Sequence, residues 1–265
     1  MSLRVTILGC GSSGGVPRLG PLWGQCDPEN PKNRRRRCSI LVEQRSKSGC
    51  TMALVDTSPD LREQMLSARI ERLDGVLYTH DHADHTHGID DLRMVAYAMK
   101  SRIACHFDQP TYDSLVGRFA YCFAQKQGSS YPPILSAHLI DPEKPVTIDG
   151  KGGVLKVIPI PQVHGDIPSL GFRFGNVAYS PDISSLPESS AALLEGLDVW
   201  IVDALRYTPH ESHFSVKQAL AHIERLKPKR AILTHMTSDL DYATLVRDLP
   251  PGVEPAYDGM VIESR

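Results

Sequence analysis

The sequence has 265 residues, of which 41% are hydrophobic and 23% charged, which is the composition of a folded chain of about one large domain. Its formal net charge of -2 excludes a bulk attraction to nucleic acid or anionic membrane, and no apolar run approaches the roughly 20 residues of a membrane-spanning helix. We expect one domain over residues 1–265, with neither a membrane nor a nucleic-acid partner.

The N-terminal residues show no signal-peptide pattern, and the six cysteines stand at irregular spacings. A chain of this length does not depend on disulfide bonds for its stability. We therefore expect a cytoplasmic protein with reduced thiols.

Apolar runs of strand length recur along the chain and are apolar on both faces in several places. They lie at 4–9, 39–43, 52–57, 75–80, 155–160, 176–180, 199–204 and 230–235. Strands of this kind must be covered on both sides by helices or by a second sheet. The pattern predicts an α/β (α+β) fold with a mixed sheet core.

Two amphipathic segments can supply helical cover. The first, 58–69, predicts a helix capped by Ser58, with Leu61, Met65 and Leu66 on its buried face. The second, 215–226, opens with Ser215 and repeats apolar residues at intervals of three and four.

A glycine-rich stretch, GCGSSGG at 9–15, follows the first predicted strand and matches the dinucleotide-binding pattern GxGxxG. That pattern requires a helix immediately afterwards, because the helix N-terminus holds the pyrophosphate. The next residues, VPRLGP, cannot form one. We interpret the stretch as a tight turn.

The stretch THDHADHTHG at 79–88 concentrates four histidines and two aspartates directly after an apolar run. Its HxHxDH spacing gathers four groups that can bind a metal: His80, His82, Asp84 and His85. Backbone sterics prevent adjacent Asp84 and His85 from joining both other histidines around one tetrahedral ion. The spacing therefore suggests two ions, which need further ligands.

Three candidates for those ligands are His164, Asp182 and His235, and each lies just beyond the C-terminal end of a predicted strand. Open sheets present side chains at such ends to a common crevice. We expect the three to approach the 80–85 turn.

This combination resembles the metallo-β-lactamase superfamily of binuclear hydrolases, over essentially the whole chain. The resemblance implies a four-layer αββα sandwich with the site at one edge. Because a mixed His/Asp site accepts either metal, we expect two divalent ions of manganese or zinc. The resemblance assigns His80, His82 and His164 to one metal and Asp84, His85 and His235 to the other, with Asp182 as the bridge. It also makes Asp56 the carboxylate that orients a metal-binding imidazole, and it gives Asp81 and His87 no ligand role.

Further stretches, GSSGGVP, RRRRCSILV and AYDGMVI, are similar to the PhnP-type phosphodiesterases that open phosphoribosyl cyclic phosphate. His213, which stands before the 215–226 helix, resembles the extra histidine that such enzymes place near the metals. The leaving alkoxide of a phosphodiester needs a proton, and we expect His213 to donate it as general acid, with Asp84 assisting. The expected substrate is a small cyclic or nucleotide-like phosphodiester. A homodimer is one possible oligomeric state of the chain.

The four arginines Arg34 to Arg37 have two readings: they either support the fold or orient phosphate. Relatives hold a structural zinc through a cysteine cluster, of which this chain keeps only Cys26, so we expect no such zinc.

Three alternatives remain. The same centre suits a thioester, lactone or β-lactam hydrolase that attacks a carbonyl. A nuclease would need a basic RNA-grasping arm, for which no Gly-rich insertion is found. A metal-binding or nucleotide-binding protein without turnover is disfavoured because every ligand position is filled.

Overall fold

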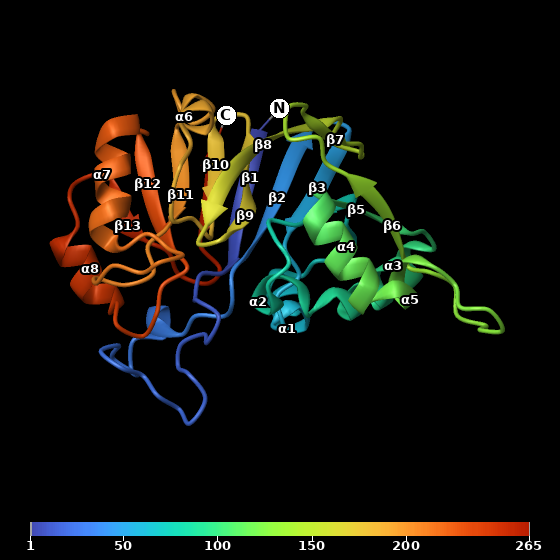
Figure 1. Cartoon of the computed structure of the whole chain (residues 1–265), viewed down its shortest axis with the longest axis horizontal. Helices are drawn as coiled ribbons and strands as arrows, with labels where there is room; N and C mark the ends of the chain where they lie inside the picture. The colour runs from blue at the N-terminus through green and yellow to red at the C-terminus, as the bar shows by residue number, and fades with distance from the viewer. Residues whose placement is uncertain (1, 265) are drawn as a thin grey trace.

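The computed structural model describes residues 2–264, which form two β-sheets packed face to face (Figure 1). The first sheet has the order β14-β1-β2-β3-β4-β5-β6. Its strands are β1 (Ser2–Gly9), β2 (Ser39–Ser46), β3 (Gly49–Val55), β4 (Gly75–Leu77), β5 (Ile103–Phe107), β6 (Leu135–Leu139) and β14 (Val261–Ser264). The second sheet has the order β13-β12-β11-β10-β9-β8-β7. Its strands are β7 (Val146–Ile148), β8 (Leu155–His164), β9 (Ile167–Phe174), β10 (Val177–Ser180), β11 (Val199–Asp203), β12 (Arg230–Thr234) and β13 (Val253–Pro255).

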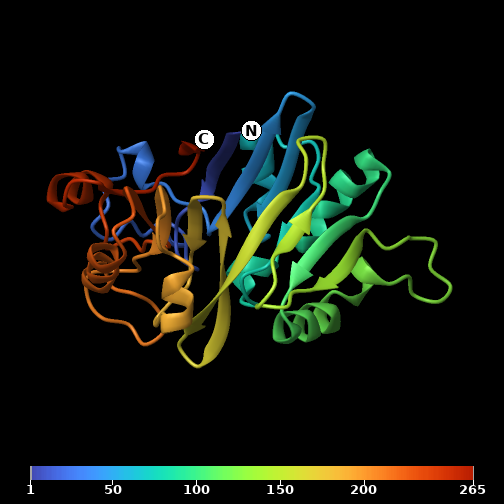
Figure 2. The ribbon, with the colours of Figure 1, turned by 90° about the horizontal axis from the view of Figure 1, so that it is seen from above.

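Helices lie outside both sheets, as the two perpendicular views show (Figures 1 and 2). Those beside the first sheet are α1 (Leu61–Ala68), α2 (Ala83–Thr86), α3 (Leu92–Met99), α4 (Gln109–Arg118) and α5 (Ala120–Phe123). Those beside the second are α6 (Glu188–Ala192), α7 (Val216–Leu226) and α8 (Tyr242–Asp248). Short 3-10 turns, η1 (Pro31–Asn33) and η2 (Ile89–Asp91), complete the set. Among residues 2–264, no helix has the length and apolar character needed to cross a membrane.

The alternation of side chains along β2 shows how the layers form. Ile40 and Val42 point into the core between the sheets, where Phe172 of β9 also packs. Leu41 points the other way, into a second core beneath α1 and α3. A strand with apolar side chains on both faces is thus buried twice, and the predicted four-layer αββα sandwich is confirmed.

All eight predicted strands are present, and the sequence reading missed β5, β6, β7, β9, β13 and β14. Most of these are short, and β9 contains Pro168 and Gly171, which weaken a strand pattern. The glycine-rich stretch forms a turn that no helix follows, as expected.

The prediction for the first helix was wrong at its start. α1 begins at Leu61, not after Ser58, because residues 59–60 form a turn in which the Ser58 hydroxyl accepts a hydrogen bond from the Asp60 amide. Leu66 is 59% exposed, so it does not belong to the buried face. The second helix, α7, has the predicted cap, since Ser215 and Gln218 form a reciprocal capping box.

The strand directions determine where polar side chains gather. β10, β11 and β12 are parallel, and β8 runs the same way because both β8 and β10 are antiparallel to β9. In the first sheet, β3 and β4 are parallel. The C-terminal ends of these strands carry the candidate residues, so chain segments far apart in sequence meet at one edge.

Candidate metal centre

The structure brings all seven predicted ligand residues to this edge. They are His80 and His82 after β4, Asp84 and His85 on α2, His164 at the end of β8, Asp182 after β10 and His235 after β12. Their ligand atoms form overlapping groups of three in which every atom lies within 4.8 Å of the others. Two of the groups are His80, His82 and His164, and Asp84, His85 and His235.

Hydrogen bonds orient the imidazoles of the first group. His164 Nδ1 lies 2.6 Å from the Ser212 carbonyl, which can only accept, so Nδ1 donates and Nε2 is left with its lone pair. That Nε2 lies 3.2 Å from His82 Nδ1. His80 Nδ1 bonds the Thr79 hydroxyl at 3.0 Å, which in turn donates to a buried carboxylate, so Nε2 of His80 is also left free.

Asp56 is that carboxylate, and it orients both groups. Its Oδ2 accepts from the Thr79 hydroxyl at 2.9 Å and from His85 Nδ1 at 2.7 Å. The expectation that Asp56 orients an imidazole is confirmed. Asp56 and His235 both have a left-handed backbone, with φ of 63° and 58°, a conformation that costs a non-glycine residue free energy and is found preferentially at functional sites.

Asp182 lies between the two groups. Its Oδ2 is 3.1 Å from His85 Nε2, and its Oδ1 is 3.4 Å from His235 Nε2. The same Oδ1 is 3.9 Å from His80 Nε2. One carboxylate therefore faces nitrogen atoms of both groups.

Four buried atoms of this cluster test whether it fits metal ions. His80 Nε2, His85 Nε2, His235 Nε2 and Asp182 Oδ2 have no hydrogen-bond partner among the described residues. Buried polar atoms are ordinarily hydrogen-bonded, so a convergent set of unpartnered lone pairs is expected where a cation binds. Imidazole nitrogens and carboxylate oxygens are the ligands of zinc and manganese, and the residues fit such ions.

The electrostatics point the same way. Burial lowers the pKa of His85, but Asp182, Asp84 and Asp56 outweigh burial and hold that pKa well above its ordinary value. Burial and the neighbouring His85 hold the pKa of His80 well below its ordinary value. Three carboxylates around one imidazole form a region of negative charge that a cation would neutralise.

His213 lies beside the cluster, as the sequence predicted. Its ring stacks on His235 with centroids 4.6 Å apart, and its Nδ1 is 2.8 Å from Asp203 Oδ2. Burial lowers the pKa of His213. The sequence reading missed Asp203, although this carboxylate ends a strand that is otherwise apolar, at the position in β11 that corresponds to Thr234 in β12.

Asp81 and His87 lie outside all these groups and contact α4 instead. Ser114 donates to Asp81 Oδ2, Arg118 donates to the Asp81 carbonyl at 2.7 Å, and the Arg118 guanidinium also lies 3.4 Å from His87 Nε2. One α4 side chain thus contacts both ends of the ligand-bearing loop.

The four consecutive arginines are engaged within the fold. Arg35 is buried and donates to the carbonyls of Thr237 and Leu240, next to the Cys26 thiol. Arg36 and Arg37 pair with Asp258 and Asp60, each at 3.0 Å, and Arg34 lies over the Trp23 ring. Of the two readings left open, the contacts of Arg34, Arg35 and Arg37 support the structural one. All six cysteines are free thiols; the absence of a structural zinc stays a prediction.

Comparison with known proteins gives four findings of different weight. A crystal structure described as a new diphosphatase from the PhnP family is 34% identical, covers 99% of this chain and 97% of that one, and superimposes with a TM-score of 0.87. The zinc-bound PqqB of Methylobacterium extorquens, 17% identical over 98% and 99% of the two chains, has a TM-score of 0.75 and shows the fold alone.

An octanoyltransferase of Porphyromonas gingivalis is 31% identical over 97% of this chain but only 51% of its own length, so the chain spans about half of that relative. The family model described as the β-lactamase superfamily domain matches residues 51–236, which is well over half of the sequence. The chain therefore belongs to the metallo-β-lactamase superfamily and is a hydrolase of that fold.

Proposed function

We propose that this hydrolase is a binuclear metal-dependent phosphodiesterase that acts on a small cyclic or nucleotide-like phosphodiester. The observation that carries the proposal is the pair of three-residue groups with Asp182 between them. His80, His82 and His164 would hold one ion. Asp84, His85 and His235 would hold the other, and Asp182 would contact both.

Manganese or zinc suits this donor set, since His and Asp ligands accept either and availability decides between them. Two such cations supply charge neutralisation at a phosphate and a more acidic water at neutral pH. The chain's own residues supply orientation: Asp56, Thr79 and the Ser212 carbonyl fix three imidazole rings before any ion arrives.

His213 is the proposed general acid. Asp203 accepts from His213 Nδ1, which fixes the ring and leaves Nε2 to hold the proton that a departing alkoxide needs. Asp84, 3.6 Å from His235 Nε2, is the second residue that we assign to catalysis. General acid catalysis is worth about a hundredfold to ten-thousandfold.

The experiment compares His213→Ala with wild type on two substrates. We expect a loss of at least about a hundredfold on 2′,3′-cyclic AMP, whose leaving group is an alkoxide, and a much smaller loss on bis(p-nitrophenyl) phosphate, whose phenolate departs without a proton. Metal content, measured by mass spectrometry, should be unchanged. His138→Ala, which removes an exposed histidine from β6, is the control. Equal losses on both substrates would remove the acid role.

A second candidate, hydrolysis of a diphosphate, is favoured by the 34% identity to the PhnP-family diphosphatase. The same cluster could act on a phosphoanhydride, because the charge to be neutralised is similar. The assay therefore includes ADP and a dinucleoside diphosphate. A thioester and a lactone belong in it as well, since a carbonyl substrate remains the alternative for this fold and one relative is named for octanoyl transfer.

We place the enzyme in the cytoplasm, and six free thiols support this. Light scattering, which measures the molar mass in solution, tests whether the chain forms a homodimer.

A further inference from the structure

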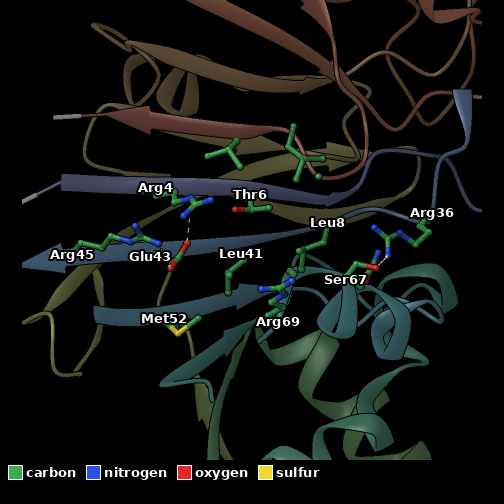
Figure 3. A pocket seen from close by; sticks show the side chains of 15 residues that line it. Arg4, Thr6, Leu8, Arg36, Leu41, Glu43, Arg45, Met52, Ser67 and Arg69 are labelled. Atoms are coloured by element: carbon green, nitrogen blue, oxygen red, sulfur yellow. Dashed lines mark hydrogen bonds and ion pairs between the residues drawn. The ribbon is translucent and has the colours of Figure 1, made fainter. Parts of the chain in front are cut away.

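A groove of about 330 Å³ lies on the outer face of the first sheet, between β1, β2 and β3 and the C-terminal end of α1 (Figure 3). Its lining includes four arginines from separate segments: Arg4, Arg36, Arg45 and Arg69. One carboxylate, Glu43, is the only acidic lining residue in the described part of the chain. None of the candidate metal ligands lines this groove, so it is a separate site.

The carboxylates in and near the groove do not balance these arginines. Glu43 lies 2.9 Å from Arg45 and 3.7 Å from Arg4. Two acids beside the groove add to it, since Asp258 pairs with Arg36 at 3.0 Å and Glu263 lies 3.6 Å from Arg4. Four guanidinium groups thus face three carboxylates, in a chain whose overall charge is negative.

Arg69 is the unmatched cation. It follows α1 with a left-handed backbone, and its guanidinium has no carboxylate partner among residues 2–264. Ser67 and Arg36 lie at the same end of the groove, where the Ser67 hydroxyl accepts from Arg36 at 3.1 Å. At the opposite end, Arg4 Nε is buried and lacks a hydrogen-bond partner within the described chain.

Between these ends the groove has apolar side chains beside the polar Thr6 and Gln64. Leu8, Leu41 and Met52 line it, from three neighbouring strands. Guanidinium forks match phosphate oxygens in geometry and charge, and pockets from about 300 Å³ upward accommodate small organic ligands. An apolar surface next to a cationic end suits a ligand with one phosphoryl group and one organic group.

We infer that this groove binds a phosphate monoester of nucleotide size, with its phosphoryl group at Arg69, Arg36 and Ser67 and its organic part over the partly exposed Met52, beneath which Leu8 and Leu41 are buried. The inference does not depend on the reaction at the metal centre. It assigns the groove a small phosphorylated ligand that is held without being turned over.

Isothermal titration of the metal-loaded full chain with AMP tests this. Any AMP that binds at the metal centre should bind equally in all variants, because none of the substitutions touches that centre. The informative quantity is the binding event that depends on Arg69. We expect that event to weaken at least tenfold in Arg69→Glu. Adenosine, which lacks the phosphoryl group, should not produce it.

Arg62→Glu is the matched control, because it makes the same charge change at the other end of α1, where the side chain is 69% exposed and lies outside the groove. Arg36→Gln, which keeps the backbone bond from Arg36 to Asp258, serves as the second groove variant, and melting temperatures show that each variant folds. AMP binding that is unchanged in Arg69→Glu, or weakened equally in Arg62→Glu, would overturn the inference.

Discussion

The metal centre and the groove behind the first sheet concentrate opposite charges. At the centre, Asp56, Asp84 and Asp182 surround His85, and four buried atoms have no hydrogen-bond partner within the described part of the chain. At the groove, cationic guanidiniums outnumber carboxylates, and among residues 2–264 the buried Nε of Arg4 has no hydrogen-bond acceptor, since its nearest carboxylates are 3.6 and 3.7 Å away. A chain with a net charge of only -2 thus separates its charges, so that one region suits cations and the other suits anions.

Removal of the metal ions by chelation should affect the metal centre and the groove most differently. Removing divalent ions with EDTA should abolish hydrolysis and lower the melting temperature by on the order of 5–10 °C, because ligands at a hundred times their Kd contribute about 2.7 kcal/mol. AMP binding that depends on Arg69 should persist in the stripped protein. Scanning calorimetry and titration measure the two effects. Loss of both together would show that the regions are not independent.

Asp182→Ala tests the residue that faces both three-residue groups. Removal of a residue that only orients a metal ligand costs about ten- to a hundredfold, so loss of this shared carboxylate should lower kcat/KM by more than about a hundredfold. Bound metal, measured by mass spectrometry, should fall by at least one equivalent. The control, Asp149→Ala, removes an exposed aspartate and should retain both. Full metal occupancy in Asp182→Ala would contradict the assignment.

Asp203→Asn removes the charge behind His213 and keeps the shape. We expect kcat on 2′,3′-cyclic AMP to fall by about ten- to a hundredfold, while metal content and turnover of bis(p-nitrophenyl) phosphate change less. The reason is the 2.8 Å contact from His213 Nδ1, which the neutral amide supports more weakly. If both substrates slow equally, Asp203 acts through His235, whose Nδ1 is 3.8 Å from it.

Arg118→Ala tests whether α4 supports the metal loop from outside. The variant loses the contacts to Asp81 and His87, which flank α2, the helix that carries Asp84 and His85. We expect metal affinity, measured by competition with a chromogenic chelator, to fall by about tenfold, the lower end of the range for outer contacts. Arg102→Ala, on an exposed arginine, should leave affinity unchanged. An equal affinity in Arg118→Ala would leave α4 with no role at the centre.

The two regions also differ in how far the sequence predicts them. His80, His82, Asp84 and His85 form a local motif, and Asp182 and His235 follow apolar strands, so spacing and strand ends together indicate the centre. Asp203 was missed because one carboxylate in an apolar strand has no partner in sequence. The groove could not be predicted, because Arg4, Arg45 and Arg69 come together only through strand pairing and the end of α1.

Ser215→Ala gives the smallest expected effect and separates scaffold from chemistry at the metal centre. Ser215 and Gln218 cap α7, which begins three residues after His213. Loss of the cap should lower the free energy of unfolding by about 1 kcal/mol, measured by urea denaturation, and leave turnover and AMP binding nearly unchanged. Ser48→Ala, in an exposed turn, should leave stability unchanged. A clear fall in turnover would instead show that the cap helps to hold His213 in place. The capped start of α7 and the Asp203 contact would then both position the short segment that carries His213.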